Sequence, residues 1–425
     1  MTRFQYPAAL SATAASCAVC LGIAAMPASA GTPLKVLYSF QGDADGSQPY
    51  AGLARDTAGN LYGTTEQGGT DGFGTVFEMT PNGDGTYAYE SIFSLTGGPE
   101  GIFPQGSVAI DGAGNLYVTA SGGGTHDGSV FELSPDGNGG FNLSNSFVFN
   151  GVGPNGNDGD GALPSAAVIL DADGNIFGTC EQGGAGNIGV GYGTVFELSP
   201  SRNGWKETTL HRFGDSPDGS FPHGSLVMDK AGDLYGTTPD GGNHGFGGYG
   251  TIFRLHQTKK GWAESILYNF TGGADGMSPA SNLIRDKAGN LYGTTALDIG
   301  TVFRLAPPAA KGADWTLATL YQFADIAGDG GYPYSGVVFD KTGNLYGTTY
   351  INGDGTGHGV VYELTPAQTG PWKETLLWNF TGGGDGKMPF ATLIFDMGEK
   401  HLLGTTSSGG AGGNGTNGTV FALKR

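Results

Sequence analysis

One segment recurs seven times along the chain at a nearly constant spacing, and this repeat constrains the fold more than any other feature. Its first copy is LYGTT, which begins at Leu61. The related segments begin at Leu116, Ile176, Leu234, Leu291, Leu345 and Leu402. The successive spacings are 55, 60, 58, 57, 54 and 57 residues. A steady period of this length is typical of an array of one supersecondary unit with small insertions in its loops.

Each repeat carries the patterns of four short strands. In the first complete copy we expect them at 52–56, 61–65, 74–78 and 90–95, which read GLARD, LYGTT, GTVFE and ESIFSL. A D-x-x-G-N turn at 56–60 joins the first two, because Gly and Asn readily adopt the positive φ of a tight hairpin. The other repeats contain the same segments, and we find no stretch with the periodicity of an amphipathic helix. The pattern therefore predicts an all-β protein.

The two ends of the repeat array complement each other. Residues 34–40 (LKVLYSF) resemble a fourth strand that lacks the preceding three, and residues 418–425 resemble a third strand without a fourth. A closed ring lets residues 34–40 complete the last blade and removes the exposed sheet edges of an open array. We predict a seven-bladed β-propeller with four antiparallel strands per blade, which forms a single domain over residues 31–425.

The first 30 residues have a different character. Arg3 precedes a small, apolar stretch at 8–26, and Ala28, Ser29 and Ala30 fit a signal-peptidase site. We therefore predict a signal peptide that is cleaved after Ala30 and a secreted or periplasmic protein. Cleavage would leave Cys180 as the one cysteine, so no internal disulfide is expected.

The charge of the chain narrows its ligand classes. Its 39 acidic residues outnumber its 20 basic residues, for a formal net charge of −19. Such a surface repels phosphate backbones and anionic lipids, which argues against nucleic-acid or membrane partners. Neutral glycans, peptides and cations are the ligand classes left, and we expect a monomer without a membrane span.

The repeat motif resembles a known family. The pattern LYGTT-x-x-G-G…GTVF-x-L-T-P is clearest at 61–81 and 176–200. It resembles the Gloeo/Verruco (GloVer) tandem-repeat family of secreted bacterial proteins, over about residues 34–425. The resemblance implies a β-propeller but no established activity, cofactor or catalytic residue. The D-x-x-G-N-L-Y turn is more loosely similar to turns of NHL-repeat and streptogramin-lyase-like propellers.

Binding residues are expected on the face that carries the long loops, namely the entry loop before each first strand and the loop between the second and third strands. The entry loops repeat the pattern acid, Gly, two residues, Pro. The acids are Asp45, Glu100, Asp160, Asp218, Asp275, Asp329 and Asp385. They could form a ring of carboxylates that binds Ca²⁺. We favour the other interpretation, in which each carboxylate accepts backbone N–H bonds within its own turn, because every blade needs that turn.

The residue after the loop proline varies between blades. It is Tyr50, Gln105, Ser165, His223, Ala280, Tyr334 or Phe390. Because the surrounding frame repeats while this position does not, the fold leaves it free for recognition or for drift without a role. Aromatic rings among a few polar groups suit the binding of sugar rings.

These observations leave three hypotheses for function. We favour a non-enzymatic binding or scaffold module that recognises a glycan or peptide at the channel mouth, through Tyr50, Gln105, Ser165, His223, Tyr334 and Phe390. The alternative is a channel-mouth lyase or hydrolase of saccharides or small cyclic substrates, in which Asp218 assists His223 in acid–base catalysis. A purely structural surface protein is the third. No cofactor is expected unless the carboxylates bind Ca²⁺, for which the candidates are Asp45, Asp160, Asp218, Asp275, Asp329 and Asp385.

Overall fold

The structure is a computed structural model. It describes residues 34–123, 127–151, 159–184, 190–214, 216–245, 247–324, 326, 328–352, 357–367, 370–411 and 415–425. The chain divides into two units, Met1–Thr32 and Pro33–Arg425, and the described residues all belong to the second. The segment predicted to be a signal peptide, residues 1–30, lies outside the described residues. In the part that is described, no helix is long and apolar enough to cross a membrane.

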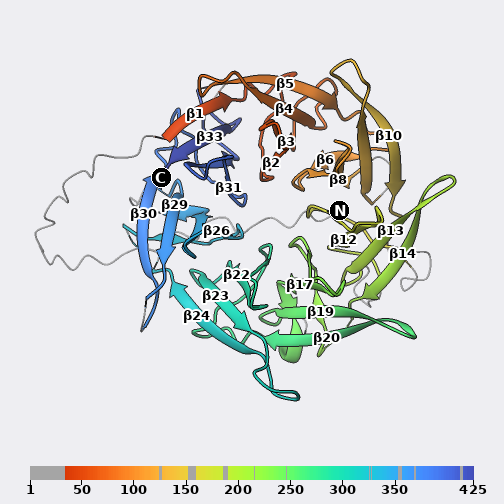
Figure 1. The fold of residues 1–425 in the computed structure, drawn as a ribbon, viewed down its shortest axis with the longest axis vertical. Helices are drawn as coiled ribbons and strands as arrows, with labels where there is room; N and C mark the ends of the chain where they lie inside the picture. Colours follow the sequence, from red (N-terminus) through yellow and green to blue (C-terminus); the bar gives the residue numbers. More distant parts are fainter. Residues whose placement is uncertain are drawn as a thin grey trace, which may run out of the picture. The chain divides into compact units, whose positions relative to one another are not determined.

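The described residues of the second unit form seven four-stranded antiparallel blades, as the repeat predicts (Figure 1). Blade 1 contains β2 (Ala54–Arg55), β3 (Leu61–Thr65), β4 (Thr75–Pro81) and β5 (Tyr87–Ser94); blade 2 contains β7 (Ala109–Ile110), β8 (Leu116–Gly122), β9 (Ser129–Pro135) and β10 (Phe141–Val148); blade 3 contains β11 (Ile169–Leu170), β12 (Ile176–Cys180), β13 (Thr194–Ser201) and β14 (Gly204–Arg212). Blade 4 contains β16 (Val227–Met228), β17 (Leu234–Thr238), β19 (Thr251–Thr258) and β20 (Gly261–Asn269); blade 5 contains β21 (Ile284–Arg285), β22 (Leu291–Thr295), β23 (Thr301–Ala306) and β24 (Thr316–Gln322). Blade 6 contains β26 (Val338–Phe339), β27 (Leu345–Thr349), β29 (Val360–Thr365) and β30 (Lys373–Asn379); blade 7 contains β31 (Ile394–Phe395), β32 (His401–Thr406), β33 (Thr419–Lys424) and β1 (Leu34–Ser39).

The ring closes where the sequence predicts. The red β1 lies beside the blue β33 in Figure 1, and the two strands pair antiparallel from Leu34 opposite Leu423 to Ser39 opposite Thr419. The first strand of the domain is therefore the outermost strand of its last blade. This pairing covers the edge of β33 that an open array would leave exposed.

The innermost strands are shorter than predicted, with two residues each in place of five. The carbonyl groups just before them bond to the neighbouring blade instead of extending the ladder. Thr405 donates to the Ala51 carbonyl at 2.9 Å, and the corresponding threonine of every blade makes the same bond, at 2.9–3.4 Å. The first threonine of the LYGTT motif is thus an inter-blade contact that repeats seven times around the ring.

The hydrophobic core lies between the blades. Seven clusters of buried side chains occupy the seven blade junctions. At the closing junction, for example, Phe40 of blade 7 packs edge-on against Phe77 of blade 1, with ring centroids 5.4 Å apart. Burial of these aromatic and aliphatic side chains is the main force that holds blade to blade.

The entry loop and the loop after the second strand lie together in every blade. Short extra strands join them in three blades, where β6 (Ile102–Pro104) pairs with β8, β15 (Gly219–Ser220) with β18 (Asp240–Gly241), and β25 (Gly330–Gly331) with β28 (Ile351–Asn352). Single β-bridges do so in the other four, as between Ser47 and Gln67. The D-x-x-G-N turns lie at the opposite ends of the second strands and join them to the first strands. In blade 1, the Asp56 carboxylate accepts the backbone N–H of Ala58 at 2.9 Å.

Candidate functional site

We call the residue after each entry-loop proline, together with the residue after each LYGTT-type segment, the mouth. A repeated pattern of backbone hydrogen bonds positions these residues. The residue before the proline has a left-handed backbone in all seven blades, with φ between 55° and 60°. In blade 7, the N–H of Met388 donates to the His358 carbonyl of blade 6 at 2.8 Å. The Met388 carbonyl accepts the N–H of Ser407 at 3.1 Å. The entry loop is thereby fixed both to the preceding blade and to the end of its own second strand.

Aromatic side chains of the mouth gather on blades 6, 7 and 1. The rings of Tyr334 and Phe390 stack with centroids 5.0 Å apart and planes inclined by 24°. Tyr50 meets Phe390 edge-on at 5.4 Å. Tyr350 lies 4.8 Å from Phe390 and 5.7 Å from Tyr334. Three of the predicted residues and one further tyrosine therefore form one half-buried cluster, which we call the aromatic arc.

Polar side chains occupy the mouth on blades 1 to 4. Gln105 donates to Glu66 at 3.1 Å. The Glu181 carboxylate accepts the Ser165 hydroxyl and lies 3.4 Å from Nε2 of His223. We call these five residues the polar arc. Blade 5 contributes small side chains at both mouth positions, Ala280 and Ala296.

Sequence reasoning missed Glu66, Glu181 and Tyr350. All three follow directly on an LYGTT-type segment, where the residues are Glu66, Ser121, Glu181, Pro239, Ala296, Tyr350 and Ser407. This position varies between blades as much as the residue after the proline does. The comparison between repeats that singled out one position could therefore have identified the other.

The two arcs meet at blade 1. Burial, and then the nearby Glu66 carboxylate, raise the pKa of Tyr50 to about 12. Burial and the neighbouring Tyr350 raise the pKa of Tyr334 to about 12 as well. Both phenols are therefore neutral hydrogen-bond donors at physiological pH.

The repeated acids act within their own entry loops. Asp45 accepts the backbone N–H of Gln41 at 2.9 Å, and Glu100 accepts that of Thr96 at 2.7 Å. The other five acids also accept a backbone N–H, Asp160 that of Asn150, Asp218 that of Gly214, Asp275 that of Thr271, Asp329 that of Ala324 and Asp385 that of Thr381. This geometry is the one that the turn interpretation predicts.

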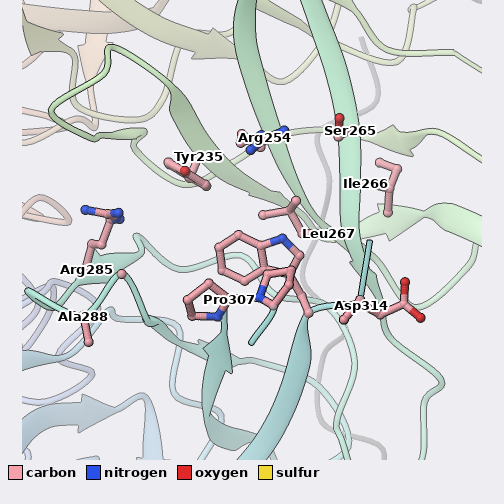
Figure 2. Close-up of a pocket in the computed structure, with 13 residues that line it drawn as sticks. Tyr235, Arg254, Ser265, Ile266, Leu267, Arg285, Ala288, Pro307 and Asp314 are labelled. Carbon is pink, nitrogen blue, oxygen red and sulfur yellow. The ribbon is translucent and has the colours of Figure 1, made fainter. Parts of the chain in front are cut away.

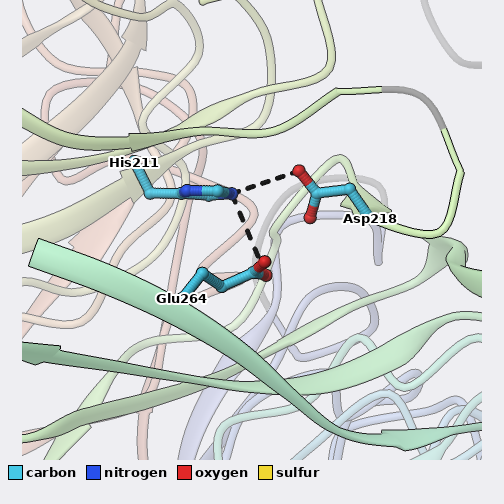
Figure 3. A group of neighbouring side chains, drawn as sticks. All are labelled: His211, Asp218 and Glu264. Atoms are coloured by element: carbon cyan, nitrogen blue, oxygen red, sulfur yellow. Dashed lines mark hydrogen bonds and ion pairs between the residues drawn. The ribbon is translucent and has the colours of Figure 1, made fainter.

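The structure gives Asp218 and His223 different partners. Asp218 Oδ2 lies 3.2 Å from Nε2 of His211, a residue of β14 outside the predicted site, whereas His223 contacts Glu181. Glu264 of β20 brings its Oε1 to 3.8 Å from the same His211 nitrogen (Figure 3). The acid–base pair predicted for the enzyme hypothesis is therefore not assembled, and Asp218 belongs instead to a cluster at the junction of blades 3 and 4.

Opposing influences act on this cluster. Burial would lower the pKa of His211, but the hydrogen bond to Asp218 and the nearby Glu264 carboxylate raise it overall. Burial and repulsion from Asp218 raise the pKa of Glu264. The three side chains offer one imidazole nitrogen and two carboxylates, which are donor types that bind metal ions.

A separate groove of about 560 Å³ lies between blades 4 and 5. Tyr235, Arg254, Arg285 and Trp315 line it, together with a D-x-x-G-N turn residue, Ala288 (Figure 2). The arginines lie 3.8 Å from Asp233 and Asp229, respectively. The groove contains no mouth residue, and its arginines already have acidic partners.

Comparison with solved structures places the fold among known propellers. One similar structure is a protein from Bacteroides uniformis ATCC 8492, provisionally named a 6-phosphogluconolactonase. It is 17% identical, with a TM-score of 0.54 over 84% of this chain and 90% of that one. A protein from Lactobacillus plantarum is 16% identical, with a TM-score of 0.49 over 78% and 84% of the two chains. At this identity the first likeness is one of fold alone. No curated protein matches the sequence.

The sequence itself carries the family relationship. The sequence model of one repeat family matches three overlapping segments, residues 21–156, 148–298 and 248–421, which together extend from the first blade into the last. The matches cover well over half of the chain. The chain therefore belongs to the Gloeobacter/Verrucomicrobia repeat family.

Proposed function

We propose that the protein is a carbohydrate-binding propeller that recognises a neutral glycan at its mouth. One observation carries the proposal: the aromatic arc of blades 6, 7 and 1 continues at Glu66 into the polar arc of blades 1 to 4. The seven repeats share one backbone framework, yet their variable positions are sorted by polarity, with aromatic side chains on blades 6, 7 and 1 and polar side chains on blades 1 to 4.

This sorting matches the chemistry of a sugar. A pyranose ring presents C–H groups on its faces, which pack on aromatic rings, and hydroxyl groups at its edge, which donate to carboxylates and amides. The aromatic arc supplies Tyr50, Tyr334, Tyr350 and Phe390 for the first kind of contact. Glu66 and Glu181 supply acceptors for the second. The same carboxylates and the net charge of −19 disfavour an anionic glycan or an acidic peptide.

We further propose that the protein acts outside the cytoplasm. The basis is the sequence of residues 1–30, with Arg3, the apolar stretch at 8–26 and the small residues that end at Ala30. Sequencing the N-terminus of the protein exported by its host would test this. A first residue other than Gly31 would contradict the predicted cleavage point.

Binding to an array of neutral oligosaccharides, followed by calorimetric titration of the best ligand, tests the function. Replacing Phe390 with Ala removes the ring that contacts Tyr50, Tyr334 and Tyr350. We expect at least a tenfold weaker binding, or about 1.4 kcal/mol. Glu181→Gln should weaken binding by less. Trp315→Ala, which removes an aromatic ring from the groove of Figure 2, should leave the affinity unchanged.

The outcomes separate the hypotheses. Glycan binding that F390A and E181Q do not weaken, while both variants keep their melting temperatures, would place the ligand elsewhere. Release of a product from the bound saccharide would favour the lyase or hydrolase alternative. Binding of neutral peptides but no saccharide, with the same loss in F390A, would make the mouth a peptide site.

A further inference from the structure

Three side chains that could bind a metal ion lie together at the junction of blades 3 and 4. His211 comes from β14, Asp218 from the entry loop that follows it, and Glu264 from β20 of the next blade (Figure 3). One ligand atom from each lies within 4.8 Å of the other two. The side chains are 20, 17 and 16% exposed, respectively, so the cluster lies close to the surface.

The spacing of the donor atoms suits a small divalent cation. Nε2 of His211 lies 3.2 Å from Asp218 Oδ2 and 3.8 Å from Glu264 Oε1. Two ligand atoms bound to a tetrahedral Zn²⁺ lie about 3.4 Å apart, since Zn–N and Zn–O bonds are about 2.1 Å long. Glu264 Oε1 is buried and has no hydrogen-bond partner among the described residues. A cation beside it would compensate the burial of this carboxylate.

The supporting contacts hold the Asp218 ligand in place. Its Oδ2 accepts the N–H of Gly214 at 3.0 Å, and its Oδ1 accepts that of Gly219 at 2.7 Å. The imidazole of His211 meets the ring of Phe213 edge-on, at 4.7 Å between centroids. Such surrounding contacts orient ligands before an ion arrives.

The other junctions provide an internal comparison. At the equivalent position of the fourth strand, Tyr38, Tyr268, Tyr321 and Trp378 donate to the acid of their own entry loop. A neutral phenol or indole has no lone pair comparable with that of an imidazole nitrogen. Among the described residues, the junction of blades 3 and 4 is the one that combines an imidazole with two carboxylates.

We propose that His211, Asp218 and Glu264 bind a divalent transition-metal ion of the Zn²⁺ class at the junction of blades 3 and 4. One imidazole and two carboxylates leave room for water as a further ligand. A nitrogen ligand and so few protein oxygens disfavour Ca²⁺, which takes six to eight oxygen ligands. The ion would link two neighbouring blades on the entry-loop side of the ring.

Calorimetric titration of the EDTA-treated chain with ZnCl₂ tests the site, and the absorption spectrum of bound Co²⁺ reports its geometry. We expect one equivalent to bind. His211→Tyr installs the side chain that three other blades carry at this position, so it should keep the fold and weaken binding by about 100-fold or more. Glu264→Gln should weaken binding by at least about tenfold.

Two further variants sharpen the test. Tyr321→His should create a second site with Asp329 and Glu374, so that two equivalents bind. His401→Asn removes a histidine that, in the described part of the chain, forms an ion pair with one acid, Asp396, at 2.6 Å, and it should leave Zn²⁺ binding unchanged. Three results would each overturn the proposal: no Zn²⁺ binding by the wild-type chain, unchanged binding in folded H211Y, or a folded Y321H variant that still binds one equivalent.

Discussion

Two blade junctions of this propeller bring together three side chains from equivalent positions, and only one of the three differs between them. At the junction of blades 3 and 4, Asp218 faces His211 and Glu264. At the junction of blades 5 and 6, Asp329 accepts the hydroxyl of Tyr321 at 3.2 Å, and Glu374 lies 3.5 Å from the same hydroxyl. In both, a short extra sheet closes the entry loop, β15 with β18 and β25 with β28.

The difference lies in what each aromatic side chain can do for two carboxylates. An imidazolium carries a positive charge, and a neutral imidazole can bind a cation. A phenol has one proton to donate, and Asp329 and Glu374 share it. Burial and repulsion from Asp329 raise the pKa of Glu374 to about 7, although the Tyr321 hydrogen bond acts in the opposite direction. At the other junction, burial and repulsion from Asp218 likewise raise the pKa of Glu264, and the interaction with His211 opposes them. The two junctions thus share a pair of acids of which one has a raised pKa, and they differ in whether an imidazole or a phenol lies beside the acids.

The largest effect is expected when the acid of the second junction is removed. Asp329→Ala leaves the N–H groups of Ala324 and Gly330 without their acceptor, and it leaves the Tyr321 hydroxyl with Glu374 alone, at 3.5 Å. We expect a loss of about 3 kcal/mol in the free energy of unfolding at pH 5, where Glu374 is protonated and repulsion does not contribute.

Two controls define this loss. Asp329→Asn keeps an acceptor oxygen and should cost about 1 kcal/mol. Asp275→Ala, at the junction of blades 4 and 5, should cost less than Asp329→Ala, because the N–H of Thr271 that it leaves behind is exposed to water. Equal losses in D329A and D275A would show that burial of the loop does not matter.

Much of this architecture is predictable from the repeats. The period, the four strand patterns and the complementary ends suffice for seven closed blades, because each pattern recurs in nearly the same form. The acid–Gly turns are predictable for the same reason, since a carboxylate at Asp45 or Asp385 needs only local backbone partners.

What requires the structure is which side chains meet across the loops. Asp218 is five residues from His223 and seven from His211, so the sequence alone allows either histidine to contact it. The entry loop folds back along the fourth strand, so that the Asp218 carboxylate contacts Gly214 and His211. His223 lies farther along the chain and contacts Glu181 instead. Glu264 lies 46 residues beyond Asp218 in the sequence, and the packing of blade 4 on blade 3 brings it to the same cluster.

The next largest effect is a dependence of stability on pH. Because the pKa of Glu374 is raised in the folded state, the folded protein holds this proton more tightly than the unfolded chain does. The contribution to stability is complete below about pH 4.5 and is lost as the pH rises through about 7. After allowance for the partial exposure of Glu374, we expect the free energy of unfolding to fall by about 2 kcal/mol between pH 5 and pH 8.

Glu374→Gln should remove that part of the pH dependence. The charged and titratable groups facing Glu374 are Asp329, Tyr321 and Tyr362, so few other groups contribute locally. Denaturant unfolding at pH 5 and pH 8 measures the difference between variant and wild type. Identical pH profiles for the two proteins would rule out a raised pKa at this position.

The smallest effect tests the shared proton itself. Tyr321→Phe removes the hydroxyl that both acids approach and should cost about 1 kcal/mol. Because this hydroxyl lowers the pKa of Glu374, its loss should also move the pH-dependent fall in stability to higher pH. Tyr268→Phe is the matched control, since Tyr268 donates to Asp275 at 3.1 Å where the following blade carries Leu317 in place of a glutamate. It should cost a similar amount without moving the pH profile. A profile that moves in both variants, or in neither, would mean that the tyrosine stabilises its entry loop without tuning the second acid.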